Sequence, residues 1–280
     1  MRNNFVSTRH IRTLLFLLPV LAQFTCKAQP TPVPNGFAHN DYLHKHPLFD
    51  ALSNGFVNIE ADIFLRGNKL VVAHVFPYFK SKKTLESLYF KPLYQRVTEH
   101  NGQVFANYSK PVILMIDIKT GAEHTYRVLV PLLEKYRSML TRMENGKIIY
   151  SAVTVVLSGH KPYNLIEGNP RRLAFIDEDL RKISRDSAML NLFPMASCKY
   201  SHVLSWGGIG PIPSRQRQRL RDYVAMAHEL GSKVRLWASP ENKAVWDELL
   251  LDGVDLINTD QLANLRKYLN SNPVVLAKAD

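Results

Sequence analysis

The feature of this sequence that most limits its fold is a regular alternation of short apolar runs with longer amphipathic or capped segments. The alternation begins near residue 35 and continues to the end of the chain. The apolar runs are rich in valine, isoleucine and leucine, which is typical of strands buried on both faces of a parallel sheet. Strands are expected over 36–39, 57–64, 69–74, 112–119, 152–157, 172–176, 202–205, 234–237 and 256–258. Strands that alternate with helices in this way indicate βαβ units.

Two helices are predicted most clearly, both in the last third of the chain. The first covers 214–230, where the apolar residues fall on one stripe and Gly231 closes the end. The second is expected to begin at Ser239, an N-cap residue, with Pro240 at the first helical position. This helix is expected to end before Gly253.

The number of strands and the length of the chain favour a single-domain (β/α)8 TIM barrel, which by itself needs about 250 residues. Nine predicted strands exceed eight barrel positions, so the strand over 69–74 is expected to pair beside the second strand as a hairpin arm. A doubly wound open sheet is the competing fold and would need a glycine-rich turn after the first strand. The sequence there reads Ala-His-Asn-Asp-Tyr instead. No linker or internal repeat divides the chain, so one domain over 29–280 is predicted.

Residues 1–28 have the plan of a signal peptide. Arg2, Arg9 and Arg12 precede an apolar run over 14–22, and small residues occupy the positions before a cleavage site after Ala28. We expect export to a periplasmic or extracellular location. Two alternatives stay open, which are a lipid anchor on the cysteine at position 26 and a retained N-terminal anchor. The lipid anchor is disfavoured because the preceding Gln-Phe-Thr fits a lipoprotein signal poorly.

The charge of the chain favours an anionic substrate or an anionic surface. The leader carries four basic residues and no acidic one, so its removal lowers the formal net charge from +12 to about +8. Cys198 would then be the single cysteine, which excludes an internal disulfide. Nucleic acid is not an expected partner, because the chain has no zinc-finger spacing, no aromatic and basic RNA motif and no long basic tract.

Acidic residues at alternate positions of two predicted strands indicate a metal site. Glu60 and Asp62 share one strand face, and Asp117 and Lys119 repeat this spacing on a later strand. In a parallel barrel this places them at the mouth, where three carboxylates need more counter-charge than one lysine supplies. A single hard cation with oxygen ligands, Mg²⁺ or Ca²⁺, would supply it. The alternative is that Glu60 and Asp62 form structural salt bridges.

Histidines at the ends of two strands are candidates for acid and base catalysis. His39 ends the first predicted strand and His74 ends the hairpin arm. Histidine titrates close enough to neutral pH to accept or to donate a proton. His160 follows the strand over 152–157 and is a further candidate for the barrel mouth.

The order of these motifs resembles a known superfamily. Along the chain they are His39-Asn40, Glu60-x-Asp62, His74, Asp117-x-Lys119 and the Gly-Val-Asp-Leu-Ile-Asn-Thr-Asp segment over 253–260. Together they resemble the glycerophosphodiester phosphodiesterase and phosphatidylinositol-specific phospholipase C superfamily. Residues 39–62 are most similar to its altered-inheritance-of-mitochondria branch. The resemblance runs from about residue 35 to residue 269.

The resemblance implies roles for individual residues. They are an acid and base pair for His39 and His74, metal binding for Glu60, Asp62 and Asp117, and a phosphate contact for Lys119. Trp237 falls where sphingomyelinase D-like members keep a tryptophan at the end of the seventh strand, and ordinary core packing is the alternative for it.

The chain also departs from the common pattern of the superfamily. Asn40 and Asp41 replace the arginine and glycine that follow the first histidine in common phosphodiesterases, so Lys119, Asn40 or another cation must hold the phosphate. Asp117 stands where many relatives carry glutamate. These departures leave the specificity for glycerophosphodiesters open.

The expected function is therefore metal-dependent hydrolysis of phosphoric diesters, with a small phosphodiester or a phospholipid head group as substrate. Attack by an internal hydroxyl, which would give a cyclic phosphate, uses the same residues. A second hypothesis is an inactive barrel that binds phosphorylated lipid head groups or glycans. A zinc-dependent barrel hydrolase is a third, but no His-x-His pair ends a predicted strand. Transient contact with a membrane surface stays open, and no protein partner is predicted.

Overall fold

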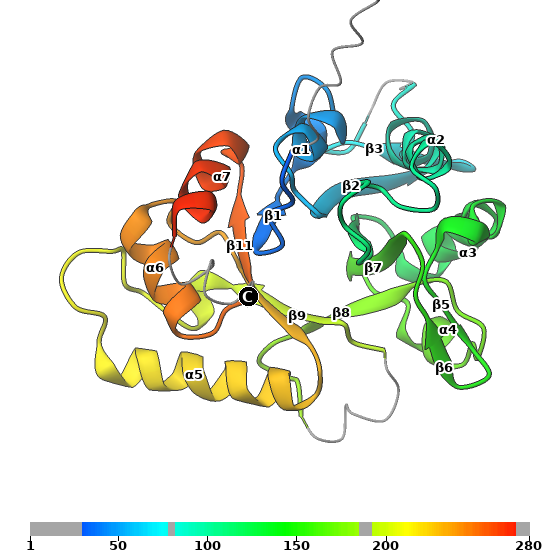
Figure 1. The fold of residues 1–280 in the computed structure, drawn as a ribbon. Coiled ribbons are helices and arrows are strands. Elements are labelled where there is room, and N and C mark those ends of the chain that lie inside the picture. Colours follow the sequence, from blue (N-terminus) through cyan, green and yellow to red (C-terminus); the bar gives the residue numbers. More distant parts are fainter. Residues whose placement is uncertain (1–29, 78–81, 185–191, 273–280) are drawn as a thin grey trace, which may run out of the picture.

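The computed structural model describes residues 30–77, 82–184 and 192–272, and the predicted leader lies outside them. In the described part, eight parallel strands form a closed barrel, and the predicted (β/α)8 architecture is confirmed (Figure 1). Around the barrel the strands are β1 (Gly36–Ala38), β2 (Asn58–Arg66), β4 (Val112–Ile118), β7 (Val153–Gly159), β8 (Phe175–Asp179), β9 (Met195–Lys199), β10 (Lys233–Trp237) and β11 (Leu256–Thr259). β11 pairs with β1 and closes the ring.

The predicted strand over 69–74 forms the hairpin arm that the sequence indicated. β3 (Lys69–Val72) pairs antiparallel with the end of β2, with Arg66 opposite Lys69. The two-residue turn between them contains Gly67 at a φ of +56°, a conformation that glycine adopts without strain. A second, separate hairpin consists of β5 (Arg142–Glu144) and β6 (Lys147–Ile149).

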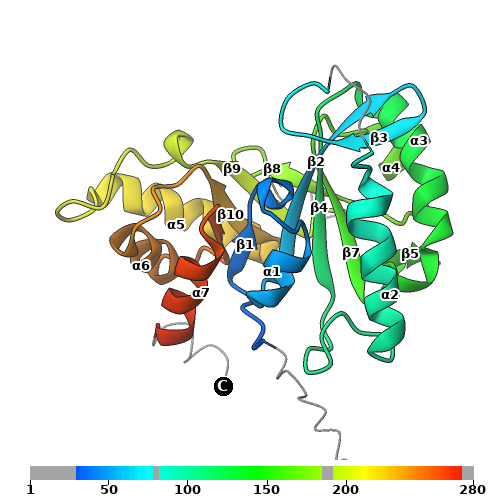
Figure 2. The same cartoon turned by 90° about the horizontal axis from the view of Figure 1, so that it is seen from above.

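Helices surround the barrel, with α5, α6 and α7 together on one side and α2, α3 and α4 on the other (Figures 1 and 2). Their bounds are α1 (Phe49–Ser53), α2 (Lys91–Glu99), α3 (Ala122–Lys135), α4 (Tyr163–Glu167), α5 (Ser214–Glu229), α6 (Lys243–Leu251) and α7 (Leu262–Ser271). Short 3-10 turns occupy Asp41–Leu43, Arg137–Met139 and Tyr200–His202, and a π-helical turn occupies Glu86–Phe90. None of the described helices is long and apolar enough to cross a membrane.

The alternation of side chains along each strand divides the apolar residues into two clusters. Ile59, Ala61 and Ile63 of β2 point outward and belong to the large cluster between the strands and the helices. A small second cluster lies inside the barrel and consists of Phe37, Ile113, Met115, Val156, Met195 and Leu256. Because Met115 and Asp117 share a face of β4, the carboxylate lies on the same inner side, above this apolar floor.

The sixth barrel strand is not where the sequence predicted it. A strand was expected over 202–205, but His202 ends a 3-10 turn and the strand is β9, Met195–Lys199. β9 reads Met-Ala-Ser-Cys-Lys, and its small and polar residues give no continuous apolar run. Its inward positions include Ser197, whose hydroxyl donates to a carboxylate of β8. Because polar side chains pair inside the barrel, β9 lacks the continuous apolar run from which the other strands were predicted.

The arm predicted to end at His74 ends at Val72, so His74 lies two residues beyond β3. Two other elements differ from their predicted bounds by three residues or more. The helix expected from Ser239 begins at Lys243, because Asn242 is the N-cap and its side chain accepts a hydrogen bond from the Val245 amide at 3.0 Å. The strand expected over 172–176 is β8, Phe175–Asp179, which extends farther toward the barrel mouth. The helix predicted over 214–230 is confirmed as α5, with Gly231 at a φ of +74° after its end.

The close approach of β4 and β7 leads to a prediction about Gly159. This residue has a φ of +67°, and a Cβ there would lie 2.1 Å from Asp117 Oδ1 and 2.5 Å from the Ile118 carbonyl oxygen. Gly159→Ala should therefore displace Asp117 and lower the free energy of unfolding in urea denaturation. The matched control is Gly146→Ala, because Gly146 also has a positive φ, +74°, but has nothing within 4 Å of an added Cβ.

We expect the control to lose about 1–2 kcal/mol through backbone strain alone. Gly159→Ala should lose about 1–3 kcal/mol more through steric overlap. Equal losses in the two variants would contradict the contact with Asp117.

Candidate active site and metal centre

The carboxyl ends of the barrel strands enclose a cavity of about 360 Å³. Every barrel strand except β11 contributes a lining residue, either directly or through the segment that follows it. Carboxyl ends of barrel strands are where (β/α)8 enzymes carry their functional groups. Of the residues predicted for the site, the cavity is lined by His39, Asn40, Glu60, Asp62, His74, Asp117, Lys119 and Trp237. His160 does not line it and lies exposed beyond the end of β7.

Three carboxylates converge at one side of this cavity. Glu60 and Asp62 are alternate residues of β2, and Asp117 of β4 is the register partner of Asp62. One oxygen from each of the three residues lies within 4.8 Å of the others. Burial raises the pKa of Asp62, and the charges of Glu60 and Asp117 add to this effect. The cluster therefore carries more negative charge than buried groups ordinarily tolerate.

Lys119 balances part of this charge. Its Nζ lies 3.0 Å from Asp62 Oδ2 and 3.1 Å from Asp117 Oδ2. Burial would lower the pKa of Lys119, but the two carboxylates outweigh burial and the pKa is raised. Lys119 therefore stays charged at the mouth of the barrel.

The carboxylate cluster fits a divalent cation. Asp117 Oδ1 is buried and has no hydrogen-bond partner, so it is an acceptor that the described residues leave unsatisfied. The three donor groups are all carboxylates, which suit Mg²⁺ or Ca²⁺ better than zinc. Glu60, Asp62 and Asp117 could therefore hold one such ion between β2 and β4.

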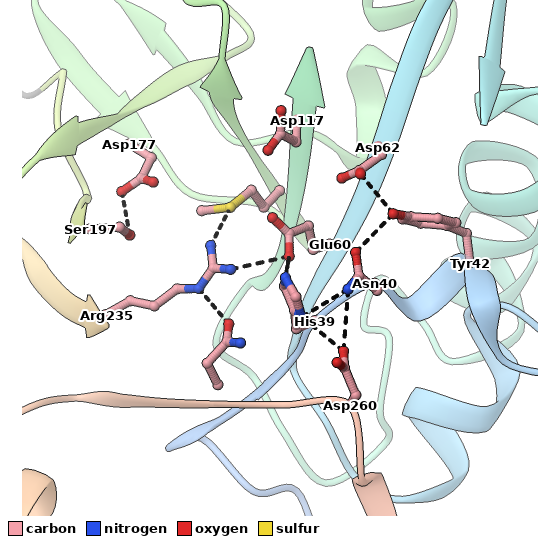
Figure 3. Close-up of polar contacts among 12 residues, drawn as sticks. His39, Asn40, Tyr42, Glu60, Asp62, Asp117, Asp177, Ser197, Arg235 and Asp260 are labelled. Carbon is pink, nitrogen blue, oxygen red and sulfur yellow. Dashed lines mark hydrogen bonds and ion pairs between the residues drawn. The ribbon is translucent and has the colours of Figure 1, made fainter. Parts of the chain in front are cut away.

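His39 is oriented by a carboxylate from the last strand of the barrel. Its Nδ1 lies 2.8 Å from Oδ1 of Asp260, which follows β11, and its Nε2 lies 3.7 Å from Glu60 Oε2 (Figure 3). The hydrogen bond from His39 lowers the pKa of Asp260, so this carboxylate is an acceptor. The imidazole proton therefore belongs on Nδ1, which leaves Nε2 directed toward the carboxylate cluster.

His74 is held on the opposite side of Asp62 by a tyrosine. The Tyr42 hydroxyl donates to Asp62 Oδ2 at 2.7 Å and lies 3.0 Å from His74 Nδ1. His74 Nδ1 itself lies 3.8 Å from Asp62 Oδ2. The Tyr42 hydroxyl also lies 2.8 Å from Asn40 Oδ1, so Asp62 and Asn40 are both acceptors for its one proton. Because His74 Nδ1 faces this hydroxyl, its Nε2 is left for a substrate. The side chain of His74 is 57% exposed at the cavity entrance.

A buried arginine, which the sequence interpretation did not assign, fixes Glu60. Arg235 of β10 donates from Nη2 to Glu60 Oε2 at 3.1 Å and from Nε to Asn258 Oδ1 at 2.8 Å. Its guanidinium also lies 3.8 Å from the centre of the Phe37 ring. Figure 3 shows this arginine reaching across the barrel interior between the carboxylates of β2 and β8. The sequence did hold one signal for Arg235. It stands two residues before Trp237, so the two side chains lie on the same face of β10.

Other lining residues escaped the sequence interpretation as well. Asp177 of β8 is buried below the cavity and accepts a hydrogen bond from the Ser197 hydroxyl at 2.7 Å. Lys161, Arg181 and Lys199 line the side of the cavity that faces the carboxylate cluster. Asp260 and Tyr42, which contact the two histidines, gave a weaker signal, because both follow strand ends in segments without regular alternation.

Fold and site together define a parallel barrel with an acidic cluster at its mouth and a histidine at each end of that cluster. The family described as AIM6-like phosphodiesterase domain matches residues 23–177, more than half of the chain, and the chain belongs to this family. The matched range contains both histidines, the three carboxylates and Lys119. The predicted membership in the altered-inheritance-of-mitochondria branch is therefore confirmed.

Curated relatives named altered inheritance of mitochondria protein 6 are similar over most of the chain. The protein of Eremothecium gossypii is 28% identical, over 82% of this chain and 68% of its own length. That of Lachancea thermotolerans is 27% identical, over 82% of this chain and 64% of its own length. The homologue of Arthroderma benhamiae is 27% identical, over 85% of this chain and 87% of its own. The chain thus spans about two thirds of the first two relatives.

The buried carboxyl group of Asp177 leads to a prediction about stability and pH. Burial raises its pKa to about 6, against the partial opposition of Arg235. An unfolded aspartate titrates near ~3.9, so the folded protein binds this proton more tightly and loses stability as the pH rises from about 4 to about 6. Asp177→Asn removes this titration. The stability of the variant relative to the wild type should therefore rise by about 2–3 kcal/mol across that range and then stay constant.

Urea denaturation of both proteins at a series of pH values measures this difference. Asparagine can still accept the hydrogen bond from Ser197. A stability difference between the two proteins that is constant with pH therefore reflects packing, and a difference that changes with pH reflects the carboxyl group. Parallel stability curves for the two proteins would contradict the buried titration.

Proposed function

We propose that this protein hydrolyses phosphodiester bonds, with one divalent cation and two histidines at the barrel mouth. One observation supports this most directly. His39 Nε2 lies 3.7 Å from Glu60, and His74 Nδ1 lies 3.8 Å from Asp62, so the two histidines flank the carboxylate cluster at different members. Phosphodiester cleavage needs a base for the attacking oxygen and an acid for the leaving oxygen. A site with one histidine on each side of the carboxylate cluster offers both a base and an acid.

The histidines act through their Nε2 atoms. In the neutral form, with its proton on Nδ1, a histidine accepts the proton of the attacking water through Nε2. In the cationic form the other histidine donates its Nε2 proton to the leaving alcohol oxygen as the bond between phosphorus and that oxygen breaks. Asp260 would orient the ring of His39, because its Oδ1 lies 2.8 Å from Nδ1. Tyr42 would orient the ring of His74 from a distance of 3.0 Å.

Lys119 would contact the phosphate directly, and the carboxylates would act on it through the metal ion that they hold. Lys119 Nζ, between Asp62 and Asp117, is available to an anionic phosphate oxygen and would offset the charge that develops there. Glu60, Asp62 and Asp117 would hold the Mg²⁺ or Ca²⁺, whose chemistry when bound is polarisation of the phosphoryl group. Arg235 would keep Glu60 in position for this ion through its 3.1 Å contact.

The experiment that tests this function combines histidine variants with metal removal. His39→Asn and His74→Asn should each lower turnover of glycerophosphodiesters by about 10²–10⁴, because each removes one proton transfer. EDTA should abolish the wild-type activity, and Mg²⁺ or Ca²⁺ should restore it. Phosphorus NMR of the products separates hydrolysis from formation of a cyclic phosphate.

His228→Asn is the matched control for the histidines. Its Nε2 forms a 2.7 Å contact with Asp255, similar to that of His39 with Asp260, but it does not line the cavity. The control should keep wild-type turnover, and both site variants should still bind the metal in calorimetry, since neither histidine is a proposed ligand. Wild-type turnover in both His39→Asn and His74→Asn would refute this mechanism and favour a barrel that only binds its ligand.

We also propose that the mouth contacts an anionic lipid surface, which would supply phospholipid head groups. Exposed apolar side chains lie near the mouth, with Leu43 after β1, Ile209 in the segment after β9, and Val75 next to His74. Ile209 is 92% exposed. The formal net charge, +12 for the full sequence and about +8 without the leader, favours an anionic surface. Exposed apolar side chains gain free energy when they enter the lipid boundary.

Vesicle sedimentation measures this contact. The protein should bind vesicles of phosphatidylglycerol and phosphatidylcholine, and the double variant Leu43→Ser and Ile209→Ser should bind about tenfold more weakly. Leu251→Ser is the control, because Leu251 is also exposed but ends α6, away from the strands' carboxyl ends. Equal binding by the wild type and the double variant would contradict a lipid contact at the mouth.

A further inference from the structure

The cavity has a second side that the proposed cleavage does not use. In the eight-stranded ring, β9 lies four places from β2, directly across the barrel from the carboxylate cluster. Lys199 ends β9, and its register partner on the neighbouring β10 is Trp237. Both residues line the cavity, and Trp237 is partly exposed in it. A substrate whose phosphate lies at the carboxylate cluster would extend toward these two side chains.

The cations on this side differ in how they are paired. Arg181 donates to both carboxylate oxygens of Asp179, at 3.0 and 2.7 Å, so their charges offset each other. Lys161 donates to the Asp177 carbonyl oxygen at 2.7 Å and lies 4.0 Å from Glu178 Oε1.

Lys199 is the exception among these cations. Its Nζ lies 5.9 Å from the centre of the Trp237 ring, and no carboxylate of the described residues lies within ion-pair distance of it. Lys199 is also exposed, so its ammonium group remains accessible from the cavity. The side of the cavity across from the carboxylate cluster therefore presents a cation, Lys199, that a ligand can reach.

We propose that Lys199 and Trp237 form a subsite for an anionic group, a carboxylate or a phosphate, on the alcohol portion of the phosphodiester. This inference rests on the proposed function. Trp237 contacts the carbon chain between the two anionic groups, and Lys199, which lies over one face of the indole, binds the second anionic group. The preferred substrates are phosphodiesters with an additional negative charge beyond the scissile phosphate.

The same geometry disfavours choline and other cationic head groups. An isolated tryptophan face attracts a quaternary ammonium group through its π electrons. Here the Lys199 ammonium already lies over that face. A cationic head group would be repelled by Lys199, so charge repulsion adds to the discrimination.

The test compares four glycerophosphodiesters whose released alcohols differ in the charge at the far end. The released alcohol carries a phosphate in glycerophosphoglycerol phosphate and a carboxylate in glycerophosphoglycerate. It carries no charge in glycerophosphoglycerol and a cation in glycerophosphocholine. With Mg²⁺, kcat/KM should be about tenfold higher for the anionic diesters than for the choline diester. The phosphate and carboxylate arms identify which anion the subsite prefers.

Lys199→Glu should reduce the ratio of anionic to choline turnover by about tenfold or more, because attraction becomes repulsion. Lys147→Glu makes the same change in net charge on the exposed β6, outside the cavity, and should leave the ratio unchanged. A wild-type ratio near one, or a ratio that Lys199→Glu does not alter, would overturn the subsite.

A binding measurement separates failure of the subsite from failure of the proposed function. In calorimetry with Mg²⁺, 1,3-propanediol bisphosphate should bind the wild type about tenfold more tightly than 1,3-propanediol monophosphate, and Lys199→Glu should remove this preference. If no diester is cleaved but the preference is present, the proposed function fails and the anion subsite stands. If diesters are cleaved and the preference is absent, the subsite fails alone.

Discussion

The ion pair between Arg235 and Glu60 is the contact on which the interior of this barrel depends. Arg235 starts from β10 and contacts Asn258 of β11, Met115 of β4 and Glu60 of β2, while its guanidinium lies over the Phe37 ring of β1. One side chain thus joins strands from around the ring above the apolar floor. A buried ion pair adds little net stability, but the loss of one partner leaves an unpaired charge that costs about 3–5 kcal/mol.

This ion pair also explains the asymmetry of the cavity. Glu60 is neutralised from below by Arg235, whereas Asp62 and Asp117 share Lys119 at the mouth. The remaining negative charge is therefore concentrated between β2 and β4, where Asp117 Oδ1 has no hydrogen-bond partner among the described residues. Across the ring the charges of the described residues that line the cavity are paired locally, except at Lys199. A diester with a second anionic group would match this distribution at both ends.

The sequence predicted the part of the site that strand alternation determines. Glu60 and Asp62 had to share the inner face of β2 once the outer positions were apolar, and the same reasoning holds for Asp117. His160 was misplaced toward the cavity because residues beyond a strand end no longer follow the alternation. Arg235 and β9 were missed for a common reason. Polar residues that pair with each other inside a barrel remove the apolar signal, and their partners are distant in sequence.

The hairpin arm that precedes His74 has a consequence for how this site can diversify. His74 follows β3, which pairs with β2 on one edge and with residues 83–84 on the other and is not one of the eight barrel strands. One residue inserted into the turn at Gly67 would move His74 along the strand by about 3.4 Å and exchange the two faces of the arm. The barrel itself would stay intact. The side chain of His74 can thus be relocated by changes in a two-residue turn, while the carboxylate cluster keeps its geometry.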